Sequence, residues 1–394
     1  MNVMHELDLY RVGGVEQLFF RYLMKSQSFK QHLLLHSSKP HSFFQKSLKN
    51  YLASVSHAKK IMGLRLPKPL RGFNIARILR QKKTETLVCW NCVSNLKKGP
   101  KNRIYYEHGL ANCFKNKDFS NYLNSFDRII SCSEASKRVL ELKWKVQADH
   151  VVVSNPLFSQ SVSDKAAPRN LNLKRPFRMG VVARLVSIKA HALSLHCLKS
   201  LLRMGLNVKL LFAGDGELKD SLKALAKTLQ IEQHVQFLSN VRDIASFYQS
   251  IDLLLSFSVQ ESYGLSVIEA MANGCPVLSS LLACPVLSSK AQRQNTLQDI
   301  SQACLILEAD LPISELLDLG GVIDSRTPSF VYDPKKDKIV EAGVIDPEKA
   351  AKKIAHLLEH PELYQKMSAN AFLYARENFS FSKFTRELEA AISL

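Results

Sequence analysis

The first 157 residues of this 394-residue chain contain few acidic side chains. They hold 10 Asp and Glu against 27 Lys and Arg, and no acidic residue lies between Glu16 and Glu85. The rest of the chain is almost balanced, so most of the net charge of +19 belongs to this first part. Such an excess of positive charge in one part of a chain favours an anionic partner. An acidic membrane leaflet, a phosphorylated glycolipid and a nucleic acid are the candidates.

Long apolar runs are also missing. No run reaches the ~18–20 residues that a membrane-spanning helix needs, and the first residues lack the basic-then-apolar order of a signal peptide. The hydrophobic fraction of 46% is that of a globular protein, and the length suffices for two domains. We therefore expect a cytoplasmic protein, whose basic part would bind peripherally to the inner face of the cytoplasmic membrane.

The eight cysteines form neither a disulfide framework nor a recognisable metal site. Several lie in apolar runs, which is typical of a reducing compartment. Cys89-Trp-Asn-Cys92 has C-x-x-C spacing, but a redox or zinc role would need a helix start or a second ligand pair. We interpret it as two thiols at the end of a strand. Because no D-x-D motif stands at a strand end either, we expect no metal and no cofactor.

Strands and helices alternate along the chain in two rounds. In the first round we expect strands at 1–9, 32–36, 86–90, 103–107, 126–133 and 150–155, and helices that include 43–60 and 73–83. After a polar linker, the second round has strands at 178–182, 208–213, 235–238, 251–258 and 275–280. This alternation predicts an α/β protein of two Rossmann-like, doubly wound domains. We place them at 1–165 and 166–375, with a closing helix at 376–394.

The segment ESYGLSVIEAMANGCPVLSS, residues 261–280, is the most informative one. Helical spacing follows a short polar turn, so the backbone N–H groups of Ser262–Gly264 would lie at a helix N-terminus, where an anion binds well. Glu261 and Glu269 flank this place and can accept hydrogen bonds from sugar hydroxyls. The pattern therefore indicates a site for a phosphorylated sugar.

Two motifs carry a family resemblance. Glu261-x7-Glu269, with Y-G-L inside and E-A-M-A-N-G after it, resembles the E-x7-E signature of retaining GT-B glycosyltransferases of family 4. V-A-R-L-V-S-I-K-A-H resembles the G-R-L-x-x-x-K-G-H of that family, although Ala183 and Ala190 replace the usual glycines. The resemblance is strong over residues 176–280 and extends to 1–157 only in layout.

The resemblance implies a GT-B fold, two Rossmann-like domains facing a cleft, and a retaining glycosyltransferase that uses a nucleotide-diphosphate sugar without metal. Arg184 and Lys189 follow a strand, where fixed cations would stabilise the departing diphosphate. The residues implied for catalysis are His108, Arg184, Lys189 and Glu261. Those implied for donor binding are Gly13, Gly14, Arg184, Lys189, Glu261, Ser262, Tyr263, Gly264, Leu265 and Glu269.

Charge alone suggests the acceptor, an anionic glycolipid or glycan of lipopolysaccharide or surface polysaccharide synthesis. A basic nucleic-acid-binding protein and a GT-B-like nucleotide-sugar-binding protein without turnover remain alternatives, as does a nucleotide-sugar epimerase. The donor base and sugar, the acceptor and the role of residues 281–345 stay open. After Pro276 the usual G-G-x-P-E segment of the family is not recognisable.

Overall fold

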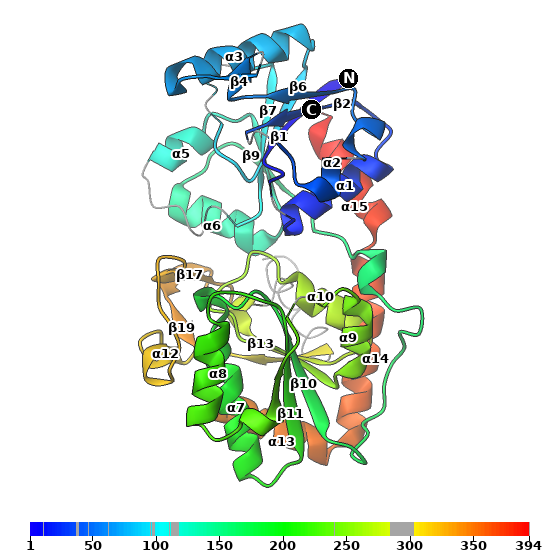
Figure 1. The fold of residues 1–394 in the computed structure, drawn as a ribbon, viewed down its shortest axis with the longest axis vertical. Coiled ribbons are helices and arrows are strands. Elements are labelled where there is room, and N and C mark those ends of the chain that lie inside the picture. The colour runs from blue at the N-terminus through cyan, green and yellow to red at the C-terminus, as the bar shows by residue number, and fades with distance from the viewer. Residues whose placement is uncertain are drawn as a thin grey trace. The chain divides into compact units, whose positions relative to one another are not determined.

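The structure is a computed structural model, which describes residues 1–394 except 11, 37–38, 46, 62, 95, 97–98, 110, 112–117, 240, 284–302 and 394. The chain forms two compact units (Figure 1). Unit 1 comprises Met1–Asn155 and Ser382–Leu394, and unit 2 comprises Pro156–Phe381. Each unit is described by itself below.

Unit 1 is built on a seven-stranded parallel sheet of order β3-β2-β1-β6-β7-β8-β9. Its strands are β1 (Asn2–Leu7), β2 (Lys30–Leu35), β3 (Ser54–His57), β6 (Thr86–Trp90), β7 (Asn102–Glu107), β8 (Arg128–Ser131) and β9 (Asp149–Val152). The helices are α1 (Gly14–Lys25), α2 (Ser42–Gln45), α3 (Lys68–Gln81), α5 (Asp118–Leu123), α6 (Glu134–Trp144) and α15 (Phe381–Ile392). The central strands are buried on both faces, as in other doubly wound sheets.

The prediction of a helix over residues 43–60 is wrong. Residues 54–57 instead form β3, which extends the sheet by pairing in parallel with β2. Its Ser-Val-Ser-His sequence alternates polar and apolar residues, which suits a partly exposed edge strand better than a helix. A short antiparallel hairpin of β4 (Lys60–Ile61) and β5 (Leu64–Arg65) follows and leads into α3.

The last helix packs onto unit 1. Ser26 Oγ donates to Glu389 Oε1 over 2.6 Å, and an Arg128 guanidinium N–H donates to the carbonyl oxygen of Ala391 over 3.1 Å. Apolar contacts add to these bonds, because the ring of Tyr22 meets that of Phe384 edge-on. The chain thus completes unit 1 with residues that are distant in sequence.

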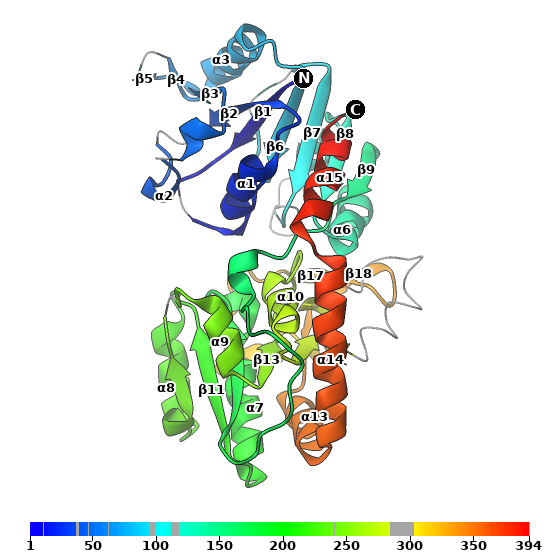
Figure 2. The same cartoon turned by 90° about the vertical axis from the view of Figure 1, so that its right-hand side faces the viewer.

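Unit 2 contains a six-stranded parallel sheet of order β12-β11-β10-β13-β14-β15. The strands are β10 (Phe177–Val182), β11 (Val208–Ala213), β12 (Val235–Phe237), β13 (Leu253–Ser256), β14 (Val277–Ser280) and β15 (Cys304–Leu307). The helices are α7 (His191–Arg203), α8 (Lys219–Thr228), α9 (Ile244–Ser250), α10 (Leu265–Ala272), α12 (Glu315–Asp318), α13 (Pro347–Glu359) and α14 (Pro361–Asn378). Helix α7 packs along α13, and α10 packs along α14 (Figure 2).

Residues 304–344 contain more structure than we expected from the sequence. They supply β15 and two small antiparallel pairs, β16 (Leu311–Pro312) with β19 (Gly343–Val344) and β17 (Phe330–Asp333) with β18 (Lys338–Glu341). These strands have only two to four residues each, so alternation along the sequence is too short to reveal them.

Each large sheet has a topological switch point, where the strand order reverses. It lies between β1 and β6 in unit 1 and between β10 and β13 in unit 2. In open α/β sheets, ligands bind beyond the carboxyl ends of the strands at this point. Within the described residues, no helix is long and apolar enough to cross a membrane.

Candidate functional site

The switch point of unit 2 brings together the loops that follow β10 and β13. These strands are neighbours in the sheet, and the N–H of Val259 donates to the carbonyl oxygen of Ile188 over 2.9 Å, which ties one loop to the other. The amine of Lys189 forms an ion pair with the Glu261 carboxylate across this junction. Two residues that lie 72 positions apart in sequence therefore meet at the place that the sheet topology favours for a ligand.

The Lys189–Glu261 pair is only partly open to solvent. The two side chains are 19% and 18% exposed, and Ser258 Oγ donates to Glu261 Oε1 over 2.8 Å. The Glu261 backbone N–H donates to Leu282 O over 3.2 Å, which fixes the start of the turn. A carboxylate held in this way presents its oxygens in a fixed direction, as hydrogen bonding to a ligand requires.

Arg184 is exposed at the same switch point, and its guanidinium has no partner in the described part of the chain. Its backbone is well fixed, because the imidazole of His191 donates to the Arg184 carbonyl oxygen over 2.9 Å. Burial lowers the pKa of His191 to about 4, so this ring is neutral at pH 7. The site therefore offers one cation that is open to an arriving anion and a second, Lys189, that is shared with Glu261.

The turn at Gly214 packs directly against the loop that carries Arg184. Gly214 has φ of +152°, and a Cβ atom there would overlap the carbonyl oxygen of Ala183. The neighbouring N–H of Leu185 donates to Asp215 O over 3.0 Å. A side chain at Gly214 would therefore displace the loop that carries Arg184.

Glu269 is buried on α10, with 8% of its surface exposed. The hydroxyl of Tyr248 donates to Glu269 Oε2 over 2.9 Å, which orients the carboxylate. Gly264 precedes the helix as its N-cap with φ of +75°, a left-handed conformation that glycine adopts without strain. The ring of Tyr263 is buried against Phe379, so Tyr263 has only its backbone to offer a ligand. Ser262 and Leu265 are half-buried on either side.

The predicted residues of unit 1 lie in loops and at a helix start that follow its strands. Gly14 begins α1, and a Cβ atom on it would meet nothing within 4 Å, so packing within the chain does not demand a glycine there. A Cβ atom on Gly13 would meet the carboxylate of Glu16 at 2.5 Å. A carboxylate therefore already stands at the N-terminus of α1, where the positive end of the helix dipole favours it.

His108 follows β7 and packs against aromatic rings. Its centroid is 4.1 Å from that of Tyr106, and the ring stacks parallel to Trp90 at 6.0 Å. Burial lowers the pKa of His108 to about 3, and its enclosed Nε2 has no hydrogen-bond partner among the described residues. His108 is therefore a neutral donor or acceptor at pH 7 and not a cation.

Three hydrogen-bonded partners of the site were not predicted from the sequence. Ser258 orients Glu261, Tyr248 orients Glu269, and Asp324 accepts a 2.6 Å hydrogen bond from Ser187 in the loop that leads to Lys189. Tyr248 and Asp324 are far in sequence from their partners, and nothing in the motifs marks them. Ser258 stands three residues before Glu261, so its spacing was the one available signal.

The sequence also contains a histidine pair that was not predicted as a metal-ligand group. His356 and His360 are four residues apart, and together with Glu359 they place potential ligand atoms within 4.8 Å of one another at the end of α13. His356 and Glu359 are exposed, and His360 Nδ1 already donates to the His356 carbonyl oxygen over 2.7 Å. This group is remote in sequence from all predicted site residues.

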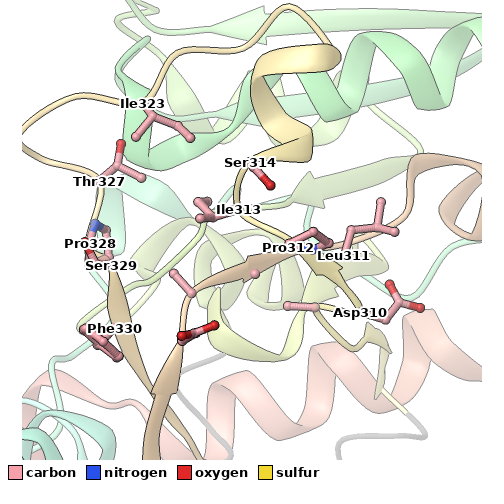
Figure 3. Close-up of a pocket in the computed structure, with 14 residues that line it drawn as sticks. Asp310, Leu311, Pro312, Ile313, Ser314, Ile323, Thr327, Pro328, Ser329 and Phe330 are labelled. Atoms are coloured by element: carbon pink, nitrogen blue, oxygen red, sulfur yellow. The ribbon is translucent and has the colours of Figure 1, made fainter.

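A separate hollow of about 540 Å³ lies among the small strands of unit 2 (Figure 3). Its lining comes from residues 309–314, 323, 327–330 and 341–343, and includes Phe330 beside Ser329. None of the predicted site residues lines it. The Asp310 side chain at its edge is paired with Lys349.

Known proteins resemble parts of this chain. Residues 163–289 match the model of the family described as Glycosyl transferases group 1. An uncharacterized glycosyltransferase of Haemophilus influenzae is 29% identical over 182 residues, which are 45% of this chain and 49% of that protein. Protein CapJ of Staphylococcus aureus is 28% identical over 116 residues, 28% of this chain and 29% of that protein. The chain thus spans less than half the length of these curated relatives.

Solved structures match the chain over its full length. HepE of Anabaena, crystallised with UDP, has a TM-score of 0.71 at 15% identity, and the match covers 100% of each chain. WaaG, a glycosyltransferase involved in lipopolysaccharide biosynthesis, has a TM-score of 0.66 at 13% identity with 99% of each chain covered. The expected α/β fold of GT-B type, with parallel sheets in two domains, is therefore confirmed.

Proposed function

We propose that the chain is a glycosyltransferase that moves a sugar from a nucleotide-diphosphate donor to a glycan or glycolipid. One observation carries the proposal: the ion pair of Lys189 with Glu261, beside the exposed Arg184, at the switch point of unit 2. These residues lie inside the segment 163–289 that matches the group 1 family. HepE was crystallised with UDP and with UDP-glucose, which makes UDP the first nucleotide to test.

Each polar group of this site has a role in the proposal. Glu269, oriented by Tyr248, accepts hydrogen bonds from the ribose hydroxyls. Glu261 and the backbone amides of Ser262–Leu265 hold the donor sugar and its phosphate, because N–H groups at a helix N-terminus attract anions. Arg184 and Lys189 neutralise the leaving diphosphate. Arg184 binds two phosphate oxygens through its fork, and Lys189 acts as a point charge.

The transfer proceeds with retention and without a metal in this proposal. The acceptor hydroxyl attacks the anomeric carbon from the face that the diphosphate leaves, and its proton passes to the departing phosphate oxygen. The fixed cations stabilise the charge that develops on this oxygen. Gly13 and Gly14 contribute backbone groups near the diphosphate, and His108, neutral at pH 7, hydrogen-bonds the donor sugar.

The proposed acceptor belongs to lipopolysaccharide or surface polysaccharide synthesis. WaaG is involved in lipopolysaccharide biosynthesis, and a lipopolysaccharide outer core galactosyltransferase, WaaB, has a TM-score of 0.66 with this chain at 14% identity. Such acceptors carry phosphate and sit on a membrane, which agrees with the excess of Lys and Arg in residues 1–157.

We propose that the membrane contact is made by a surface of unit 1 that we name the basic hairpin patch, residues 64–73. Phe73 and Leu64 are 77% and 76% exposed, and Leu70 is half exposed one turn before Phe73 on the same face of α3. Buried Asn74 donates to the carbonyl oxygens of residues 58 and 60, which fixes α3 against the hairpin. The bases in and around this patch are Lys60, Arg65, Lys68, Arg71, Arg77 and Arg80.

Apolar side chains surrounded by cations suit the interface of an anionic membrane. These side chains bury into the headgroup region, while each nearby Lys or Arg contributes about 1 kcal/mol at an anionic surface. A nucleic acid is a less suitable partner for this patch, because the exposed side chains of Leu64, Leu70 and Phe73 are apolar. We therefore assign the patch to peripheral binding at the inner face of the cytoplasmic membrane.

The transferase proposal is tested with UDP-glucose and related donors in the presence of a lipopolysaccharide-core acceptor. We expect release of UDP, transfer to the acceptor and a product with the anomeric configuration of the donor, measured by NMR. Addition of EDTA should leave the rate unchanged. A nucleotide that binds without turnover would favour the binding protein, and isomerisation of free UDP-sugar would favour the epimerase.

The membrane proposal is tested by sedimentation with vesicles. We expect binding to phosphatidylglycerol vesicles and not to phosphatidylcholine vesicles, and a partition coefficient about tenfold lower in Phe73→Ser, which corresponds to about 1.4 kcal/mol. Leu317→Ser, at an exposed apolar position in unit 2, is the control and should bind as wild type does. Equal binding to both vesicle types overturns the assignment, and a salt-sensitive gel shift with RNA or DNA would revive the nucleic-acid alternative.

A further inference from the structure

The switch point of unit 1 holds a buried cluster of side chains that the proposed transfer does not use. Glu6 stands near the end of β1 and is fully buried, and His36, just past β2, is nearly so. His36 Nε2 lies 2.7 Å from Glu6 Oε1. Cys89 near the end of β6 and Cys92 just beyond it complete the group, which we name the thiol cluster.

Both thiols of the thiol cluster hydrogen-bond to Glu6. The S–H of Cys89 donates to Glu6 Oε2 over 3.2 Å, and that of Cys92 donates to the Glu6 carbonyl oxygen over 3.2 Å. The two sulfur atoms therefore lie within hydrogen-bond reach of the same residue. A C-x-x-C turn allows two such thiols to approach as a disulfide requires.

The two thiols differ in access and in charge. Cys89 is fully buried and Cys92 is half-buried, so a small reagent reaches Cys92 first. Hydrogen bonds from Cys89 and His36 lower the pKa of Cys92, although burial opposes this, whereas burial raises the pKa of Cys89. Burial alone lowers the pKa of His36, but its hydrogen bonds to Cys92 and Glu6 raise it to about 10, so the imidazole is a cation at pH 7.

The groups that face Cys92 come from five elements. Glu6 belongs to β1, His36 follows β2, Cys89 belongs to β6, Tyr105 belongs to β7, and Tyr122 belongs to α5. Tyr122 donates to the Cys92 carbonyl oxygen over 3.1 Å. Of these groups, the His36 cation favours the Cys92 thiolate and the Glu6 anion opposes it. A neighbouring cation and a partner thiol are the surroundings in which cysteines become reactive.

We propose that Cys92 and Cys89 are an oxidisable dithiol, in which Cys92 is the nucleophile toward a small peroxide and Cys89 is the resolving thiol. The Cys92 thiolate attacks one oxygen of hydrogen peroxide. An S–O bond forms, the O–O bond breaks, and hydroxide leaves and becomes water with one proton, so that Cys92 is a sulfenic acid.

The second step closes the disulfide. The Cys89 thiol passes its proton to the Glu6 carboxylate and attacks the Cys92 sulfur, so the S–S bond forms and the S–OH bond breaks. The hydroxide that leaves takes up this proton as water. In sum, two thiols lose two electrons and two protons to one peroxide, and two waters are produced. A dithiol reductant reverses the reaction by exchange.

The experiment uses the full chain under native conditions and peptide mass mapping. Trypsin cleavage after Lys83 and Lys97 releases one peptide that holds Cys89 and Cys92 and no other cysteine. After treatment with hydrogen peroxide and quenching with iodoacetamide, we expect this peptide two hydrogen atoms lighter and unalkylated, and restored by dithiothreitol. Cys132 is the control, because it is buried in the same unit and its pKa is raised to about 12. It should stay reduced.

Variants separate the roles of the side chains. In Cys89→Ser, peroxide should leave Cys92 as a sulfenic acid that dimedone traps. In His36→Asn, alkylation of Cys92 at pH 7 should be about tenfold slower and its pH profile should move upward, while exposed His41→Asn should behave as wild type does. The proposal is overturned if the peptide stays reduced, if Cys132 is oxidised equally fast, or if the purified chain carries stoichiometric zinc on the two thiols.

Discussion

Replacing Lys189 by Met removes one half of the central ion pair and leaves the Glu261 carboxylate without its counter-ion. Breaking a fully buried pair from one side costs about 3–5 kcal/mol. Here the side chains are 19% and 18% exposed, and Ser258 still donates to the carboxylate, so we expect a loss of about 1–3 kcal/mol in the stability of unit 2. The double variant Lys189→Met with Glu261→Gln has no unpaired charge and should recover most of this loss.

The affinity for nucleotide should respond to these two variants differently from the stability of unit 2. Loss of a charged hydrogen bond to phosphate costs about 1.5–3 kcal/mol, which raises the Kd for UDP by about 10–100-fold. The double variant cannot restore this affinity, because the lysine is still missing. Scanning calorimetry measures the melting of unit 2, and isothermal titration measures the UDP affinity. Lys209→Met, an exposed residue on β11 of the same sheet, is the control.

The combination of results decides whether Lys189 binds phosphate or only holds Glu261. Recovery of the melting temperature without recovery of UDP affinity supports the phosphate role. If the double variant binds UDP as tightly as wild type does, Lys189 has only a structural role and the assignment of the diphosphate to this loop is refuted.

Three further outcomes follow from the contacts. Tyr248→Phe removes a donor from the buried Glu269 carboxylate and should lower stability by about 1–3 kcal/mol; an unchanged melting curve would contradict the bond. Gly214→Ala should weaken UDP binding through displacement of the Arg184 loop, and a crystal structure with that loop unmoved would show the reasoning wrong. Burial lowers the pKa of His5 to about 4, whereas the unfolded chain binds this proton near pH 6.5, so His5 by itself should cost unit 1 up to about 3 kcal/mol as the pH falls from 6.5 to 4. A melting temperature of unit 1 that stays constant between pH 6.5 and pH 4 would contradict this prediction.

The local structure around the candidate site of unit 2 could be predicted to a large extent, because its groups are ordered by local sequence. Glu261, Gly264 and Glu269 belong to one strand–turn–helix unit, whose periodicity and glycine positions are visible in a short window. Gly274 ends the helix with φ of +68°, as its place after the apolar stripe predicts. The Lys189–Glu261 contact follows from topology, since both loops leave neighbouring parallel strands at their carboxyl ends.

Other features could not be predicted because they depend on tertiary packing. Residues 54–57 were predicted to be helical, but they form strand β3 because they pair with β2. The local spacing of apolar residues does not encode this pairing. The thiol cluster was interpreted as two unremarkable thiols, because the C-x-x-C spacing shows neither Glu6 nor His36. These partners lie 83 and about 50 residues upstream, and only the parallel order of β2, β1 and β6 brings them together.

The two switch points differ in what an arriving diphosphate would have to displace. In unit 2, Arg184 meets only solvent within the described residues, and Lys189 can share its protons between Glu261 and a phosphate, so binding leaves no buried group without a partner. In unit 1, buried Glu6 already accepts from His36 and both thiols, and a second anion beside it would face a buried carboxylate. An anion beside a buried carboxylate is strongly disfavoured unless that carboxylate takes up a proton. The cations of unit 2 are therefore the better place for the diphosphate of the proposed donor, and the thiols of unit 1 are left for the oxidation that we propose.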